Sequence, residues 1–336
     1  MSMGEGEDGT AGHLRVAVYA IGGNALSDPR KPSDGAGEGQ ALALAKVLSD
    51  IVDLLEAGYI VVVTHGNGPQ VGDLLLLEER AAAAEDMVTR PRIGLDSWVA
   101  ATQGMIGHEL ALNLDSVLQR KGGPERTAVI LTRVEVEADD PAFDLPSKPV
   151  GPVLSADAVM KEEWDIAATG IGPRRVVASP LPKSILDLAV IRTLVGQGAV
   201  VFCGGGGGIP VIRMDDHWVG VSAVIDKDRF SALLATELSA DVLLISTAID
   251  SLRTGFGTSS EKSLTEISCA DALAGIESGE FPPGSMGPKL SAMVIAKQTI
   301  TDCEVLMCAP GDALKALRGE SGTRPRTRSG RAVRCC

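Results

Sequence analysis

Six short apolar runs, separated by candidate helices, constrain the fold of this chain most strongly. The runs are continuously apolar rather than alternating, which is typical of strands buried on both faces of a parallel sheet. They occupy residues 16–21, 59–63, 128–131, 199–202, 242–245 and 305–307. The candidate helices lie at 40–56, 69–84, 97–120, 226–238, 288–297 and 312–317. This alternation predicts an α/β fold, a three-layer αβα sandwich around a mostly parallel sheet.

The charge balance excludes two classes of partner. The chain has 336 residues and a formal net charge of −13, so its surface repels nucleic acid and anionic membranes. No apolar run reaches the ~18 residues of a membrane span. The six cysteines form no Cys-x-x-Cys pair and no set with zinc spacing, so we expect free thiols in a reducing cytoplasm. A phosphate-binding site in such a chain must be made locally positive.

Composition divides the chain into three parts. Residues 1–12 are acidic and glycine-rich, and we expect a disordered leader there. Residues 13–323 carry the apolar pattern and form the main domain. Within it, 132–176 contains several prolines and little helical periodicity, which indicates a small protruding subdomain that could act as a lid. Residues 324–336 contain five arginines and are predicted to be a flexible basic tail, with a polyanion-binding arm as the alternative.

Glycine-rich turns follow three of the apolar runs. They are Gly22-Gly23-Asn24-Ala25, His65-Gly66-Asn67-Gly68-Pro69-Gln70 and the glycines from Gly204 to Gly208. Glycine lets the backbone turn sharply and brings its N–H groups close to an anion. Pro69 at the first position of a helix would direct the positive end of the helix dipole to the same place. Because the carboxyl ends of parallel strands meet at one edge of a sheet, these turns predict an anion site there.

Charged residues at three further places could supply cations to that site. Asp226-Lys227-Asp228 opens a candidate helix, where one aspartate can cap the helix while the other faces the crevice. Lys289 ends a glycine-flexed entry into another candidate helix, and Lys148 lies in the predicted lid. From the residues alone, a solvated surface position is the more usual interpretation for lysines of this kind. The P-loop pattern and the HRD and DFG motifs of protein kinases are absent from the sequence.

In this order, the motifs resemble those of the carbamate kinase family of the amino-acid kinase superfamily. The matching strings are GGNAL at 22–26, THGNGPQVG at 64–72, TQGMIG at 102–107, DPAF at 140–143, SKPVGP at 147–152, RRVVASPLPK at 174–183, GGGGIPV at 205–211, VIDKD at 224–228 and GSMGPK at 284–289. The resemblance covers nearly the whole chain, from about residue 15 to about 323. It implies an αβα sandwich with a mostly parallel eight-stranded sheet, and a homodimer.

The resemblance also implies an activity. Members of such a family transfer a phosphoryl group between ATP and carbamate, giving ADP and carbamoyl phosphate, with Mg²⁺ accompanying the nucleotide. The cell usually runs this reaction toward ATP. No side chain of this sequence is implied as a metal ligand. The N-terminal half is expected to hold the carbamate or carbamoyl group, and the C-terminal half is expected to hold the nucleotide.

By motif position, the resemblance assigns roles to residues of this chain. Lys289 is expected to contact the terminal phosphates of the nucleotide, and Lys227 to lie on the phosphate side. Asp228 is expected to hold the lysines in place, and Lys148 to reach in from the lid. Further nucleotide contacts are implied for Thr247, Phe256 and Met286. Binding of the phosphoryl group and the carbamoyl oxygens is implied for Gly22, Gly23, Asn24, Gly66, Asn67, Gly68, Gly205 and Gly206.

Three departures from the family pattern leave alternatives open. Ala248 stands where the family has an acidic residue, and Arg253 and Pro173 stand where aromatic residues are usual. A kinase for another small carboxylate or phosphonate would therefore also fit, as would a non-catalytic sensor of nucleotide or carbamoyl phosphate. The sensor hypothesis predicts the loss of Lys289 or Asp228, and the sequence retains both.

Overall fold

The computed structural model describes residues 14–22, 37–82, 93–156, 164–282 and 286–327 of the chain. Its centre is a six-stranded sheet in which every neighbouring pair of strands is parallel. The strand order is β16 (Glu304–Cys308), β12 (Val242–Ser246), β1 (Val16–Ile21), β2 (Ile60–His65), β9 (Val200–Cys203) and β3 (Thr127–Ile130). Each strand coincides with one of the apolar runs to within two residues at either end, so the predicted sheet strands are confirmed.

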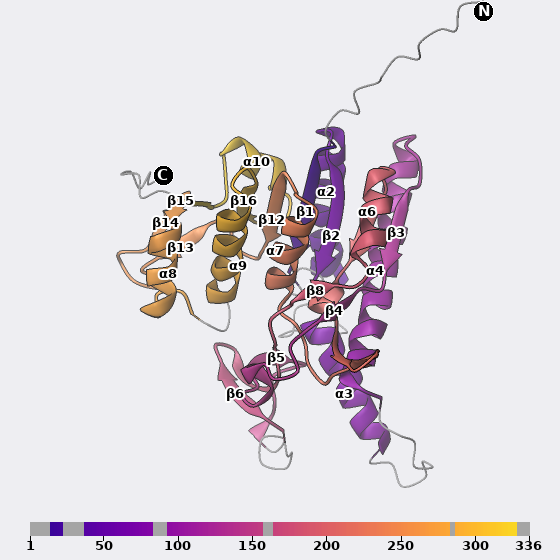
Figure 1. Cartoon of the computed structure of the whole chain (residues 1–336). Helices are drawn as coiled ribbons and strands as arrows, with labels where there is room; N and C mark the ends of the chain where they lie inside the picture. Colours follow the sequence, from indigo (N-terminus) through magenta and orange to yellow (C-terminus); the bar gives the residue numbers. More distant parts are fainter. Residues whose placement is uncertain (1–13, 23–36, 83–92, 157–163, 283–285, 328–336) are drawn as a thin grey trace, which may run out of the picture.

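Helices cover both faces of this sheet and complete the predicted three-layer sandwich (Figure 1). One face carries α2 (Gly37–Glu56), α4 (Leu95–Arg120) and α10 (Ala313–Arg318). The other face carries α6 (Leu188–Gly196), α7 (Lys227–Glu237) and α9 (Met286–Thr299). Outside α9 lies α8 (Cys269–Glu277), and the apolar pattern predicts neither α8 nor α6.

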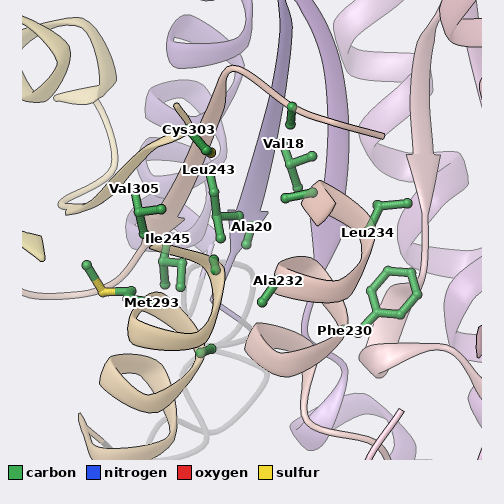
Figure 2. Close-up of a cluster of buried hydrophobic side chains, with 14 of the residues drawn as sticks. Val18, Ala20, Phe230, Ala232, Leu234, Leu243, Ile245, Met293, Cys303 and Val305 are labelled. Carbon is green, nitrogen blue, oxygen red and sulfur yellow. The ribbon is translucent and has the colours of Figure 1, made fainter. Parts of the chain in front are cut away.

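The apolar runs are continuous because successive side chains of each strand point to opposite faces of the sheet and helices cover both faces. In β1, Tyr19 packs into the layer that contains α2, whereas Val18 and Ala20 pack into the layer that contains α7. Figure 2 shows the second layer, where Val18 and Ala20 face Phe230 and Leu234 of α7. Successive side chains of a strand point to opposite faces of a sheet, so a strand covered on both sides needs apolar residues at every position.

The strand count of the central sheet differs from the expected eight. Four further strands form a separate sheet in the order β11 (His217–Gly220), β10 (Ile209–Met214), β4 (Arg133–Glu135) and β8 (Ser184–Ile185). The glycine run between β9 and β10 has positive φ at Gly204, Gly206, Gly207 and Gly208. This backbone, which residues with a Cβ rarely adopt, redirects the chain so that β10 pairs with β4 instead of extending the central sheet. Among the described residues, the central sheet therefore has six strands.

A small three-stranded sheet projects from one end of the sandwich, as the proline-rich excursion predicted (Figure 1). Its strand order is β5 (Lys148–Val150), β7 (Gly172–Val177) and β6 (Ile166–Thr169). The subdomain is narrower than the predicted 132–176, because β4 belongs to the second sheet. It is seated on α3 (Gly68–Ala82), where a Cβ added at Gly72 would lie 1.9 Å from the Cα of Gly151.

The C-terminal part adds two short pairs of strands. They are β13 (Leu252–Thr254) with β14 (Lys262–Leu264), and β15 (Glu266–Ser268) with β17 (Arg324–Arg326). The predicted basic tail therefore begins too early, because its first three residues form β17, where Arg324 donates to the carbonyls of Ala316 and Leu317. Residues 328–336 and the predicted leader lie outside the described residues. No helix among the described residues is both long enough and apolar enough to cross a membrane.

Candidate active site

A pocket of about 600 Å³ lies where five strands of the central sheet end. Its floor is formed by residues that follow β1, β2, β9, β12 and β16, namely Gly22, Gly66, Asn67, Gly68, Gly206, Thr247, Ala248 and Pro310. The walls come from the first turns of α7 and α9, from α2 and from the protruding sheet. The turns that follow parallel strands thus meet in one place, as the sequence predicted.

The pocket is electropositive within an acidic chain. Of the described residues that line it, six have cationic side chains and two have carboxylates, and the cations are Lys46, Lys148, Arg174, Lys227, Arg229 and Lys289. The whole chain carries −13. The two carboxylates belong to Asp226 and Asp228. This local excess of positive charge is the condition that a phosphate site must meet on an otherwise negative protein.

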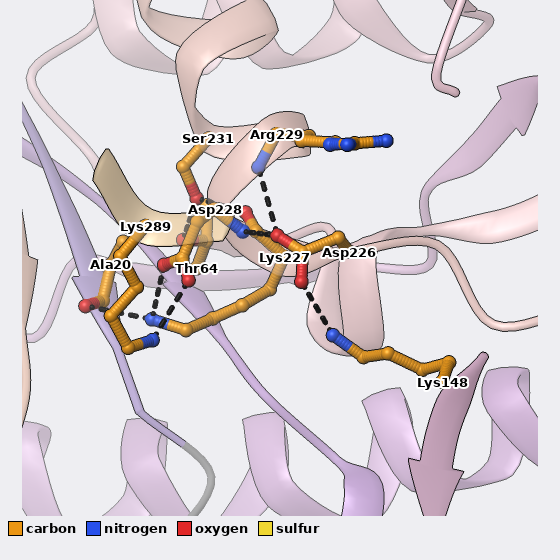
Figure 3. Close-up of polar contacts among 9 residues, drawn as sticks. All are labelled: Ala20, Thr64, Lys148, Asp226, Lys227, Asp228, Arg229, Ser231 and Lys289. Carbon is orange, nitrogen blue, oxygen red and sulfur yellow. Dashed lines mark hydrogen bonds and ion pairs between the residues drawn. The ribbon is translucent and has the colours of Figure 1, made fainter. Parts of the chain in front are cut away.

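Asp228 brings the ammonium groups of two lysines together (Figure 3). Lys227 Nζ lies 2.9 Å from Asp228 Oδ1, and Lys289 Nζ lies 2.8 Å from Asp228 Oδ2. Lys227 also donates to the carbonyl of Ala20 in β1 at 3.2 Å, which fixes its tip against the central strand. The arrangement follows from helix packing, because α7 and α9 lie side by side and their first turns face the same strand ends. Without the shared carboxylate the two ammonium groups would repel each other.

Burial and mutual charge shift the pKa values of this cluster. Burial alone would raise the pKa of Asp228, but Lys227 and Lys289 outweigh it and hold the pKa below its ordinary value. Burial lowers the pKa of Lys227 to about 8, although Asp228 acts in the opposite direction. Burial would also lower the pKa of Lys289, but Asp228 raises it above its ordinary value. At neutral pH, both lysines are therefore cations and Asp228 is an anion.

Asp226 connects the helix start to the protruding sheet. It is the N-cap of α7, where its Oδ1 accepts from the backbone N–H groups of Asp228 and Arg229 at 2.9 and 3.2 Å. Its Oδ2 accepts from Lys148 Nζ at 2.5 Å. Burial would raise the pKa of Asp226, but Lys148 outweighs it and lowers the pKa. The prediction that one aspartate caps and the other faces the crevice is confirmed: Asp226 caps, and Asp228 faces the lysines.

The glycine turns approach one another closely. Gly206 lies against the side chain of Asn67, and a Cβ added at Gly206 would lie 2.3 Å from Asn67 Nδ2. Gly66 and Gly68 line the pocket on either side of Asn67. Gly205 does not line the pocket, and its added Cβ would lie 2.4 Å from Cε1 of the buried His65. Gly23 and Asn24, which the resemblance implies as binding residues, lie outside the described residues.

Sequence reasoning missed the side chains of α4 that hold these turns. Thr102 accepts a hydrogen bond from Asn67 Nδ2 at 2.9 Å. Gln103 is fully engaged, since its Oε1 accepts from the N–H of Thr132 and its Nε2 donates to the carbonyl of Gly205, both at 2.9 Å. A neutral amide within a helix carries no motif chemistry, and only its place in the string TQGMIG could have marked it.

The predicted nucleotide contacts Thr247, Phe256 and Met286 do not all line the pocket. Thr247 lines the pocket beside Ala248. Phe256 is 76% exposed and does not line it. Met286, in the first turn of α9, packs partly buried against the core cluster around α7 and α9 instead. Contact of Phe256 or Met286 with a nucleotide therefore stays a prediction.

Comparison with known proteins identifies the family of this chain. The family model for the amino acid kinase family matches residues 15–306. Carbamate kinase-like protein YqeA of Escherichia coli is 40% identical over 310 residues, which cover 91% of this chain and 97% of that relative. Carbamate kinase of Halobacterium salinarum is 38% identical over 315 residues, which cover 92% of this chain and 98% of that relative. The chain belongs to the carbamate kinase family.

Solved structures of carbamate kinases share the fold over nearly the full length. Carbamate kinase from Giardia lamblia bound to citric acid superposes with a TM-score of 0.84 at 33% identity, covering 94% of this chain and 99% of that one. The Giardia lamblia enzyme bound to AMP-PNP gives a TM-score of 0.81 at 33% identity, with the same coverage. The resemblance stated from the motifs is therefore confirmed.

The departures from the carbamate kinase pattern have different places in the structure. Ala248 lines the pocket. Arg253 does not line it, and its guanidinium pairs with Glu261 at 2.6 Å and with Asp250 at 3.3 Å. Pro173 pairs with Ala168 in the protruding sheet. Of the three, Ala248 is placed to affect what the pocket binds.

Proposed function

We propose that this chain transfers a phosphoryl group between ATP and carbamate, forming ADP and carbamoyl phosphate, and that it works toward ATP in the cell. The observation that carries the proposal is the cluster in which Asp228 gathers the ammonium groups of Lys227 and Lys289 beside the glycine turns. Carbamate kinases of other organisms, 37–38% identical to this chain, support the choice of substrate. Carbamoyl phosphate is a mixed anhydride with a high transfer potential, which favours ATP formation.

The length of the pocket fits two substrates placed end to end. Neighbouring strands lie about 4.8 Å apart, so the five strand ends from β16 to β9 span roughly 19 Å. We assign the nucleotide to the end lined by Thr247, Ala248 and Pro310. The carbamoyl group then lies toward Gly66 and Gly68, beneath the protruding sheet. The lysine cluster lies between these two ends, because Lys227 contacts the carbonyl of Ala20 in β1. The phosphoryl group would pass at this position.

The proposed transfer needs positioning and charge neutralisation rather than a base. Carbamate is already an anion, so its oxygen attacks the γ-phosphorus as the bond to the leaving ADP oxygen breaks, and no proton has to move. In such in-line transfers negative charge spreads over the phosphoryl oxygens. Lys227 and Lys289 are placed to balance that charge, and Lys148 to reach it from the protruding sheet. Asp228 orients the lysines and, with its lowered pKa, holds no proton to exchange.

We propose that Mg²⁺ enters this pocket together with the nucleotide. Both pocket carboxylates are engaged, Asp226 with Lys148 and Asp228 with Lys227 and Lys289. The described residues contain no group of three His, Cys, Asp or Glu side chains suited to a metal ion. Mg²⁺ commonly binds through substrate phosphates with few protein ligands. When bound, it would neutralise charge on the nucleotide's phosphates.

A coupled assay tests the proposal directly. Purified protein with carbamoyl phosphate, ADP and Mg²⁺ should form ATP, and Lys289→Ala should abolish ATP formation while ion-paired Lys121 on the surface can be changed to Ala without loss. ATP formation only from a different acyl phosphate would instead favour a kinase for another small carboxylate. Ligand binding without turnover would favour a sensor.

We also propose that the chain forms a homodimer in the cytoplasm. The edge strand β3 exposes Val129, and Leu131 beside it is exposed as well. Met105 and Leu112 are exposed on α4, which packs next to β3. An apolar surface of this kind suits a contact with a second copy. Light scattering should show a dimer, and Leu112→Asp should shift it toward the monomer; a wild-type monomer would contradict the proposal.

The proposed location in the cytoplasm is supported by the cysteines. The four described cysteines are unpaired, as in a reducing compartment.

A further inference from the structure

Among the described residues, Arg174 is a pocket cation that has no carboxylate partner. It lines the pocket from β7, the central strand of the protruding sheet. Its Nε and Nη2 donate to the carbonyl of Gly151 at 2.9 and 2.6 Å. Among the described residues no carboxylate forms an ion pair with it, and burial lowers its pKa with no opposing charge effect. A half-buried cation is costly unless an anion joins it, so this position favours the binding of an anionic ligand.

Within the part of the chain that the structure describes, the hydrogen bonds to Gly151 leave one edge of the guanidinium without a partner. Arginine has five N–H donors in a planar fork, and the contact with Gly151 uses the edge formed by Nε and one hydrogen of Nη2. The opposite edge, with one hydrogen on Nη1 and one on Nη2, keeps the geometry that matches two oxygens of a planar carboxylate. Carbamate has such a pair of oxygens.

The position of Gly151 places Arg174 on the acyl side of the pocket. The N–H of Gly151 donates to the carbonyl of Gly68 at 3.0 Å. Because Arg174 donates to the carbonyl of Gly151, this one residue connects Arg174 to the turn after β2. That turn lies two strands away from β12, whose end carries Thr247 at the proposed nucleotide end. Arg174 is therefore placed to meet the acyl substrate rather than the nucleoside.

We propose that Arg174 binds the carboxyl-type oxygens of carbamate and the corresponding acyl oxygens of carbamoyl phosphate, and thereby helps to select a small planar acyl substrate. This assignment rests on the proposed carbamate kinase activity. It makes Arg174 a substrate-binding residue, in addition to the lysines that neutralise the phosphoryl group.

The neighbouring arginine supplies a matched control. Arg175 follows Arg174 in the same strand, so the two side chains leave opposite faces of β7. Arg175 donates to Glu79 at 2.7 Å, stacks on Trp164 and does not line the pocket. Arg175→Met thus removes the same charge from the same strand at a place away from the proposed substrate. Arg174→Lys keeps the charge at Arg174 but cannot bridge Gly151 and a carboxylate with one planar group.

The experiment compares wild type with Arg174→Met, Arg174→Lys and Arg175→Met in two assays. Titration calorimetry measures binding of phosphonoacetamide, a stable analogue of carbamoyl phosphate, without nucleotide, and of ADP separately. The coupled assay measures KM and kcat for carbamoyl phosphate. We expect analogue affinity to fall at least about tenfold in both Arg174 variants and KM to rise in parallel, with ADP affinity unchanged. Arg175→Met should behave as wild type. Thermal melts show that each variant is folded.

The outcomes separate this inference from the proposed function. If wild type makes ATP but Arg174→Met binds the analogue normally, Arg174 does not bind substrate and only this inference fails. If both Arg174 variants lower kcat alone, or weaken ADP and analogue equally, Arg174 only supports the loop around Gly151, and the inference is overturned. If wild type forms no ATP, the proposed function fails, and the calorimetric comparison still decides whether Arg174 binds an acyl anion. If wild type does not bind the analogue, the inference is overturned, whereas the proposed function is judged by ATP formation alone.

Discussion

Replacing Asp228 with asparagine removes the charge that holds two pocket lysines together. Lys227 Nζ and Lys289 Nζ lie 2.9 and 2.8 Å from its two oxygens. Asparagine has nearly the same shape but offers one acceptor oxygen and no charge, so the two ammonium groups lose their counter-ion in a buried place. We expect one lysine to lose its proton or to turn away from the site where the phosphoryl group passes.

The pKa of Lys227 sets the size of the effect. Burial, together with the charge of Lys289, lowers that pKa to about 8 even though Asp228 acts to raise it. Without the charge of Asp228 the pKa falls below this value, so a large share of molecules carries a neutral Lys227 near neutral pH. Losing one charged contact to the transition state costs about 3–4 kcal/mol, or roughly 10²–10³ in kcat. Removing one partner of a buried ion pair also costs about 3–5 kcal/mol of folding stability.

Initial rates of ATP formation across the pH range measure this loss, with urea unfolding to confirm that Asp228→Asn is folded under assay conditions. Its rate should recover partly as the pH is lowered, because Lys227 then regains its proton. Glu79→Gln is the matched control, since it removes a similar charge from the 2.7 Å pair with Arg175 outside the pocket. The reasoning is refuted if kcat of Asp228→Asn stays within about tenfold of wild type at every pH, or if Glu79→Gln loses as much.

Three further results are expected. In wild type, kcat/KM should fall above a pH of about 8, where Lys227 of the ligand-free enzyme loses its proton. The value of kcat should hold to higher pH, because bound phosphates favour the charged form of the lysine. Identical pH profiles for the two parameters would contradict this. Gly206→Ala should cost about 2 kcal/mol more folding stability than Gly257→Ala. Both glycines have positive φ, but of the two only Gly206 would bring an added Cβ against a neighbour, Asn67 Nδ2 at 2.3 Å. The midpoints of urea unfolding compare the stabilities of the two variants. Chelation by EDTA should reduce ATP formation to background and added Mg²⁺ should restore it, while full activity in EDTA would exclude a metal-bound nucleotide.

Much of the fold could be predicted because the sheet leaves a strong signal in one dimension. A strand covered on both faces must be apolar throughout, and all six central strands show this. The helices α6 and α8 were missed because each has nine residues, too few for a clear amphipathic period beside stronger neighbours. The division into two sheets was missed because it depends on the left-handed backbone of the glycine run after β9, which the sequence permits but does not require.

The site was predictable to the extent that it follows the strand ends. Gly22, Gly66 and Gly206 line one pocket because parallel strands end at the same edge. The meeting of Lys227 and Lys289 at Asp228 depends on how α7 and α9 pack, and periodicity carries no information about that contact. The family motifs supplied it instead. Neither source indicated that the residues around the carbonyl of Gly205 would be held by an uncharged amide from α4.

The two aspartates explain how a cationic pocket can be ready before its substrates arrive. Asp228 joins Lys227 to Lys289, and Asp226 joins Lys148 to the first turn of α7. Each pairing offsets repulsion among cations that would otherwise spread into solvent, so the donors need little rearrangement when negative charge develops on a migrating phosphoryl group. Because Asp226 uses its other oxygen to cap α7, a shift of the protruding sheet that moved Lys148 would act on the same helix turn that carries Lys227. In the proposed reaction, the substrate contacts of the protruding sheet and those of the lysine cluster would therefore be coupled through the carboxylate of Asp226.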